Sequence, residues 1–133
     1  MATQTVVVVE DDLNIAEVLR IGLEARGLAV RLAADGVAGL ALISKIRPDA
    51  VLLDIKMPKM NGYELCAALQ SDPAMSGIPI LIMTGLTAED GTRPDSVWRD
   101  RLGVADFVTK PFDVTDVVER TLVMLGRGEK PAG

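Results

Sequence analysis

The stretch from Val6 to Asp12, VVVVEDD, decides the fold of this chain. Four consecutive β-branched residues are typical of a strand that is covered on both faces, as strands are in a parallel sheet. The three carboxylates that follow repel one another, and such crowding raises the pKa of a carboxyl group unless a cation joins the cluster. The stretch therefore predicts a buried strand that ends at an acidic site.

The composition indicates one globular domain. The chain has 133 residues, of which 49% are hydrophobic and 25% are charged, and this length is enough to bury a core. The net charge of −5 disfavours nucleic acid and anionic membranes as direct partners. The sequence shows neither an apolar run long enough to cross a bilayer nor the pattern of a signal peptide.

Two residue counts narrow the chemistry. The single cysteine, Cys66, cannot form an internal disulfide, which favours a cytoplasmic location. We expect Cys66 in the core rather than in a catalytic role. The chain has no histidine, so it lacks the usual general base and the commonest zinc ligand. Any chemistry must therefore use carboxylates, hydroxyls and lysine.

Strand and helix patterns alternate five times along the chain. The first helix is predicted at 13–26, with Asn14 and Glu17 as a capping pair and Gly27 as its end signal. Asn61 and Asp113 are predicted to cap later helices. The predicted strands are 5–9, 28–33, 50–53, 78–83 and 105–109, and the other helices are expected at 36–47, from 61 to near 73, within 86–103 and after 113.

This alternation predicts the fold class. Buried strands joined by helices form a parallel sheet with helices on both faces. We expect an α/β protein with a flavodoxin-like (βα)5 doubly wound sandwich, whose five-stranded parallel sheet has the order 2-1-3-4-5.

Polar side chains stand at the carboxyl ends of the predicted strands. Glu10 and Asp11 follow the first strand, Asp54 the third, Thr84 the fourth and Lys110 the fifth. Ligand sites of open parallel sheets lie outside these ends, and the first and third strands are neighbours in the expected order. The carboxylates should therefore converge, and they offer the oxygen ligands that Mg²⁺ prefers.

The same edge of the sheet indicates phosphoryl transfer. Lys110, Thr84 and Mg²⁺ around Asp54 form a cage for a charged oxygen group, and phosphoryl transfer needs mainly positioning and charge neutralisation. An aspartate can act as the nucleophile and form an acyl phosphate. Asp54, which ends a buried strand, is the strongest candidate for that nucleophile.

Four motifs carry a resemblance to a known family. The segments VVVVEDD, PDAVLLDIKMPKMNG, IPILIMTG and ADFVTKPF follow one another in this order from about residue 5 to 126. In this order and spacing they resemble the receiver domain of two-component response regulators. The resemblance implies a receiver domain over residues 1–127, and residues 128–133 then form a tail or the start of a linker.

The resemblance also implies the acceptor and its metal site. Asp54 would take a phosphoryl group from a sensor histidine kinase or a phosphotransfer protein. Asp11, Asp54 and the backbone carbonyl of Lys56 would bind Mg²⁺, and Glu10 would act on the metal through water. We choose Glu10 and Asp11 rather than Asp11 and Asp12 as the acidic pair because they directly follow the apolar run.

Further roles are implied around the phosphoryl group. Thr84 and Lys110 would contact its oxygens, Gly85 would leave room for them, and the Lys110-Pro111 bond would be cis. Phe107 stands at the family's aromatic switch position, three residues before the lysine. Phosphorylation would draw Thr84 inward and let Phe107 turn into the vacated space.

The switch would act through the surface of the fourth helix, the fifth strand and the fifth helix. This surface would serve a docking partner, a fused output domain or a homodimer. The segment 86–95, which is longer than usual for the family, and Trp98 lie near it. Leu86, two positions after Thr84, could hinder attacking water, so we expect a long-lived phosphoryl group.

Other functions are weighed against this one. The main alternative is a receiver-like docking module that works without phosphorylation, because Phe107 lacks the hydroxyl that a tyrosine would keep near solvent. A phosphatase of the haloacid dehalogenase type would carry an aspartate where Lys56 stands. A flavin-binding module would need a phosphate-cradling loop, which the acidic triplet contradicts. We expect no enzyme, but a phosphoacceptor that assists its own phosphorylation and dephosphorylation.

Overall fold

The sheet forms as the sequence predicts. The computed structural model describes residues 3–55, 62–84 and 104–127. Within these ranges, five parallel strands form one sheet in the order β2-β1-β3-β4-β5. The order and the flavodoxin-like α/β class are confirmed. The strands are β1 Thr5–Val9, β2 Ala29–Ala33, β3 Ala50–Asp54, β4 Ile80–Thr84 and β5 Asp106–Thr109.

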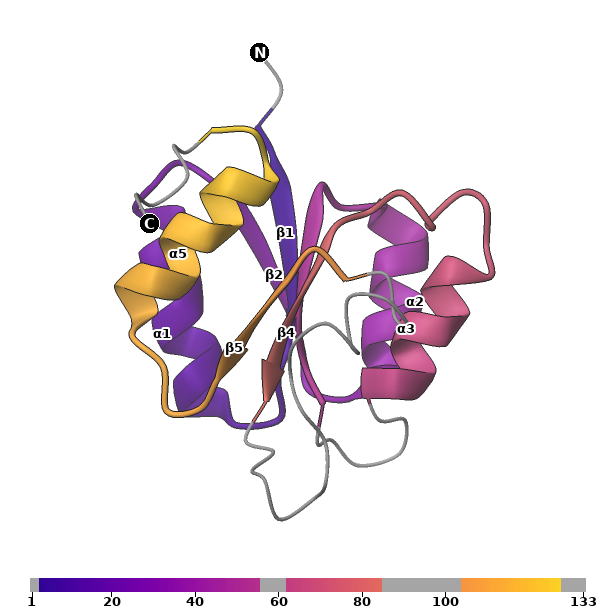
Figure 1. Cartoon of the computed structure of the whole chain (residues 1–133), viewed down its shortest axis with the longest axis horizontal. Helices are drawn as coiled ribbons and strands as arrows, with labels where there is room; N and C mark the ends of the chain where they lie inside the picture. The colour runs from indigo at the N-terminus through magenta and orange to yellow at the C-terminus, as the bar shows by residue number, and fades with distance from the viewer. Residues whose placement is uncertain (1–2, 56–61, 85–103, 128–133) are drawn as a thin grey trace.

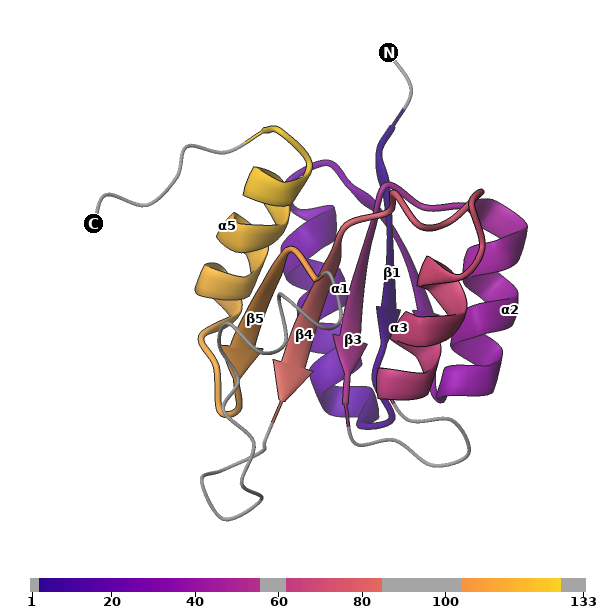
Figure 2. The same ribbon diagram turned by 45° about the vertical axis from the view of Figure 1, so that its right-hand side comes forward.

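Helices cover both faces of the sheet. α1 (Leu13–Glu24) and α5 (Val114–Met124) lie side by side on one face, and α2 (Gly36–Ile46) and α3 (Gly62–Gln70) cover the other (Figures 1 and 2). The helix predicted within 86–103 lies outside the described residues. Among the residues that the structure describes, no helix has the length and apolar character of a membrane span.

The two faces of the sheet bury alternate residues of each strand. Val7 and Val9 of β1 belong to the core under α2 and α3, whereas Val6 and Val8 belong to the core under α1 and α5. All four valines are fully buried. The uninterrupted apolar run is therefore explained by cover on both faces. Cys66 lies in the first of these cores, as predicted.

Several element boundaries shift by one to three residues from the predicted ranges, and two differences from the predictions have a clear local cause. Asp12, not Asn14, caps α1, because its carboxylate accepts the N–H groups of Asn14 and Ile15; the predicted pair of Asn14 and Glu17 is therefore wrong. β4 begins at Ile80 rather than at 78, because the N–H of Ile78 donates to the turn that follows α3.

Two other end signals act as the sequence predicts. Asp113 caps α5 as predicted and accepts the N–H of Thr115 at 2.8 Å. Gly27 adopts the left-handed conformation, with φ 83°, shortly after α1 ends at Glu24. Asn61, the predicted cap of α3, lies outside the described residues.

Candidate functional site

The strands point their carboxyl ends toward one edge of the molecule (Figure 2). Glu10 directly follows β1, Asp54 and Thr84 end β3 and β4, and Lys110 follows β5. β1 and β3 are adjacent, with Val9 opposite Leu53, and β4 and β5 are adjacent, with Thr84 opposite Thr109. The parallel order therefore gathers at one edge the residues that the sequence places at the strand ends.

Three carboxylates form the centre of this edge. Glu10, Asp11 and Asp54 each place an oxygen within 4.8 Å of the others. Glu10 and Asp54 are buried, with 1% and 4% of their surface exposed, whereas Asp11 is exposed. The convergence of the acidic groups that the sequence predicts is therefore present, and the cluster has one side open to solvent.

Lys110, which directly follows β5, reaches into the same cluster. Its Nζ donates to Glu10 Oε1 at 2.6 Å and to Asp54 Oδ2 at 3.3 Å. The backbone N–H of Lys110 donates to the carbonyl of Thr84 at 2.7 Å, which fixes the start of the loop after β5. The Lys110-Pro111 peptide bond is cis, as the resemblance implies.

Burial and charge shift the ionisation of this pair. Burial raises the pKa of Glu10 to about 7. The negative charge of Asp54 also raises this pKa, whereas the hydrogen bond from Lys110 lowers it. Burial alone would lower the pKa of Lys110, but the hydrogen bond to Glu10 and the charges of Asp54 and Glu10 outweigh it and raise that pKa. The ammonium group therefore stays charged beside the carboxylates.

The backbone around the cluster holds the carboxylates in place. The N–H of Asp12 donates to Glu10 Oε2 at 3.1 Å, so the turn into α1 is tied to the glutamate. At the end of β3, the N–H of Gly62 donates to the carbonyl of Ile55 at 3.0 Å. α1 and α3 therefore both begin against the acidic edge of the sheet.

The donor set fits a divalent cation with a preference for oxygen. Three carboxylates lie within reach of one ion, and Mg²⁺ is bound in proteins by a few carboxylates while it keeps several waters. The exposed side chain of Asp11 leaves such waters access to solvent. Lys56, whose carbonyl is the third expected ligand, lies outside the described residues.

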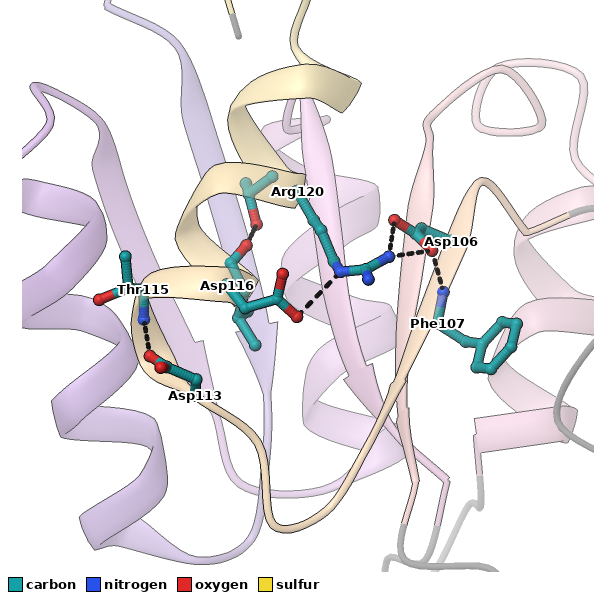
Figure 3. Close-up of polar contacts among 8 residues, drawn as sticks. Asp106, Phe107, Asp113, Thr115, Asp116 and Arg120 are labelled. Carbon is teal, nitrogen blue, oxygen red and sulfur yellow. Dashed lines mark hydrogen bonds and ion pairs between the residues drawn. The ribbon is translucent and has the colours of Figure 1, made fainter. Parts of the chain in front are cut away.

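Thr84 and Phe107 occupy neighbouring strands. Thr84 is fully buried at the end of β4, and Phe107 in β5 is half-buried and packs against the core under α2 and α3. The Phe107 ring points away from Arg120, whose guanidinium bridges Asp106 of β5 and Asp116 of α5 (Figure 3). The proposed switch residue therefore sits on a strand that is clamped to α5.

An apolar groove adjoins the cluster, and the sequence reasoning missed it. It has a volume of about 520 Å³ and is lined by residues of α1 and of the segment from Lys110 into α5, among them Ile15, Val18 and Phe112. Leu13 and Ile21 on α1 are strongly exposed. Apolar residues outside the core-facing stripe of helix 13–26 were the signal that could have indicated this surface.

Several expected residues fall outside the described ranges. Gly85, Leu86 and Trp98 and the long segment 86–95 are among them. Their predicted roles stay predictions.

Comparisons with known proteins agree with this geometry. The sequence profile of the response regulator receiver domain matches residues 6–122. The chain is 34% identical over 125 residues to the DNA-binding dual master transcriptional regulator RpaA of Synechocystis, covering 94% of this chain and 50% of that protein. It is 37% identical over 126 residues to the DNA-binding response regulator MtrA of Mycolicibacterium smegmatis, covering 95% and 52%.

A solved structure shows the same fold. The CheY-like response regulator receiver domain protein of Methanospirillum hungatei superposes with a TM-score of 0.83 at 27% identity, covering 94% of this chain and 95% of that one. The chain belongs to the response regulator receiver domain family. It spans about half the length of the curated relatives named above.

Proposed function

We propose that this domain receives a phosphoryl group on Asp54 from a phosphohistidine of a sensor histidine kinase or phosphotransfer protein. The observation that supports this most directly is the position of the Asp54 carboxylate. It is buried at the end of β3, 3.3 Å from the Lys110 ammonium and within 4.8 Å of two further carboxylates. A lysine and an acidic cluster around one aspartate suit phosphoryl transfer rather than acid–base chemistry.

The reaction is a displacement at phosphorus. An Asp54 oxygen attacks the phosphorus atom and forms the acyl phosphate, while the P–N bond breaks and its electron pair stays on the imidazole of the donor. Lys110 lies beside the attacking carboxylate and shields the negative charge of the incoming oxygens. Thr84, at the end of the adjacent strand, donates its hydroxyl to a phosphoryl oxygen.

The acidic cluster would hold a magnesium ion. Asp11, Asp54 and the carbonyl of Lys56 would bind it directly, and Glu10, whose oxygens are engaged by Lys110 and the N–H of Asp12, would act through water. When bound, Mg²⁺ supplies positive charge beside the phosphoryl oxygens. The domain thereby assists its own phosphorylation and dephosphorylation without being an enzyme that acts on other substrates.

The output passes through Thr84 and Phe107. Thr84 moves toward the phosphoryl group, and Phe107, which already packs partly against the core, turns further inward. The face formed by β5 and α5, together with the helix expected within 86–103, then changes for a docking partner, a fused output domain or a homodimer. Such a change needs only a shift between two existing conformations.

The phosphodonor would cover the apolar groove beside α1. Lys110 belongs both to this groove and to the acceptor cluster, so a protein bound in the groove would hold its phosphohistidine close to Asp54. We take residues 1–127 as the receiver domain in the cytoplasm and 128–133 as a tail or the start of a linker. The net charge of −5 disfavours direct contact of this domain with DNA or membranes, whatever the full-length relatives bind.

The test is labelling by a small phosphodonor. Wild-type protein incubated with Mg²⁺ and radiolabelled acetyl phosphate should gain label, and Asp54→Asn should lose it with the fold intact by circular dichroism. Asp49→Asn, which removes an exposed carboxylate at the other end of β3, is the matched control and should label normally. Label that persists in Asp54→Asn places the acceptor elsewhere.

One observation favours a second function. Phe107 already packs against the core, as a docking module that works without phosphate would require. Beryllofluoride with Mg²⁺ mimics the phosphoryl group and separates the two cases. A working receiver shows saturable amide shifts in β5 and α5, whereas the docking module shows none.

A further inference from the structure

Lys110 is engaged with the acidic cluster before any phosphoryl group is present. Its Nζ lies 2.6 Å from Glu10 and 3.3 Å from Asp54. The Glu10 side chain is fully buried, while the Lys110 side chain is 22% exposed. The lysine is therefore partly exposed, and its ammonium group neutralises part of the charge of the buried carboxylates.

Both oxygens of Glu10 accept hydrogen bonds from the chain itself. Oε1 accepts from the Lys110 ammonium, and Oε2 accepts from the N–H of Asp12. Asp54 Oδ2 accepts from the same ammonium. A cation bound among Glu10, Asp11 and Asp54 must therefore share two of the three carboxylates with Lys110.

The charges make this sharing unfavourable. Two positive groups a few ångströms apart repel each other even in a high dielectric, and more strongly where water is excluded. Each also loses part of its attraction when the other neutralises the same carboxylates. Linkage requires that two such groups weaken each other's binding by the same factor.

We infer that Lys110 is a tethered competitor of the divalent cation. It keeps the affinity of the acidic site for the ion low, and it loosens from Glu10 when the ion binds, which frees the ammonium for phosphoryl oxygens. The inference rests on the proposed function, because it adds an earlier step to the role of Lys110. A lysine that only contacted the phosphoryl group would leave the affinity for the ion unchanged.

The experiment is a magnesium titration followed by NMR. Amide shifts of Asp54 and Ile55 in the ¹⁵N-labelled full chain report binding, at pH 8.5, where Glu10 is ionised. Lys110→Met removes the charge but keeps an unbranched side chain, and we expect it to lower the Kd for Mg²⁺ about tenfold. Lys110→Arg keeps the charge and should stay within about threefold of wild type.

Two further variants locate the effect. Lys45→Met removes the same charge from an exposed position in the last turn of α2 and should leave the Kd unchanged. In a Glu10→Gln background, Lys110→Met should lower the Kd by clearly less than in wild type, because part of the competition runs through Glu10. Circular dichroism checks folding, and Lys110→Gln replaces the methionine variant should that one not fold.

The outcomes separate this inference from the proposed function. Magnesium that binds wild type, with no tightening in Lys110→Met, overturns the competition alone. An equal effect of Lys110→Met with and without Glu10 overturns the role of Glu10 as the resting partner of the lysine. A wild-type chain that binds no Mg²⁺ overturns the metal site of the proposed function, and the competition with it.

Discussion

Gly62 lies so close to the end of β3 that a Cβ atom at this position would fall 2.9 Å from the carbonyl oxygen of Asp54 and 2.8 Å from the Cα of Ile55. Both neighbours are backbone atoms, which cannot rotate away as a side chain can. α3 therefore begins directly against the strand end that carries the proposed acceptor. Glycine is required at this position because any larger residue would place its Cβ atom too close to the backbone at the end of β3.

Gly62→Ala should destabilise the fold and disturb the acceptor. Overpacking of this kind typically costs about 1–3 kcal/mol, which urea unfolding measures, and labelling of Asp54 by acetyl phosphate should slow because the strand end must shift. Gly77→Ala is the matched control, since a Cβ at Gly77 meets nothing within 4 Å. Equal stabilities of the two variants would contradict the close approach.

Thr84→Ala should separate phosphorylation from output. Asp54 and Lys110 remain in place, so labelling should persist, at a rate reduced by about a hundredfold, the lower end of the cost of losing one supporting donor. The amide shift of Phe107 on addition of beryllofluoride should shrink, because the hydroxyl that moves toward the phosphoryl group is gone. Thr109→Ala, at the exposed opposite position on β5, should keep the full shift.

Cys66 should be inert in the folded protein. Burial raises the pKa of its thiol to about 12, and only the thiolate reacts with alkylating agents. Below that pKa the thiolate fraction rises tenfold per pH unit, so it is roughly a thousandfold below that of an ordinary thiol at pH 8. Iodoacetamide should therefore modify the folded chain slowly and the urea-unfolded chain quickly.

The single cysteine makes this reading unambiguous. Mass spectrometry counts the adduct without assignment of its position. Folded and unfolded rates of similar size would mean that α3 opens readily from the sheet.

The sequence predicted the features that depend on local pattern. The run from Val6 to Val9 predicted a strand covered on both faces, and the polar residues at strand ends predicted which groups would meet, because parallel strands share one edge. The cap of α1 was misassigned to Asn14, since Asp12 stands equally well before the apolar periodicity. Which acidic residue turns toward the helix depends on the path of the chain after Glu10.

The details of the site required the three-dimensional packing. The contact between Glu10 and Lys110 joins residues 100 positions apart: the sequence predicted that both lie at one edge of the sheet, but not which carboxylate the ammonium group contacts. One of the two ion pairs of Arg120 could have been predicted, because Asp116 and Arg120 stand at i, i+4 spacing on one helix. The other ion pair, with Asp106, depends on how α5 lies against β5.

Arg120 joins β5 to α5 through two carboxylates (Figure 3). Its Nη1 donates to both oxygens of Asp106, at 3.0 and 2.9 Å, and its Nε donates to Asp116 at 3.0 Å. Asp106 Oδ1 also accepts the N–H of Phe107 at 2.8 Å. The clamp therefore reaches the backbone of the proposed switch residue.

Arg120→Met should loosen this face without affecting the acceptor. The side chain is 35% exposed, so solvent screens its ion pairs and the loss of stability should be about 1 kcal/mol. Labelling of Asp54 should be unchanged, while amide hydrogen exchange of Phe107 and Val108 should quicken. Arg20→Met is the matched control: Arg20 also pairs with two acidic residues, but both lie on its own helix, so exchange in β5 should stay as in wild type. If Arg120→Met leaves exchange in β5 unaltered, the clamp does not restrain Phe107.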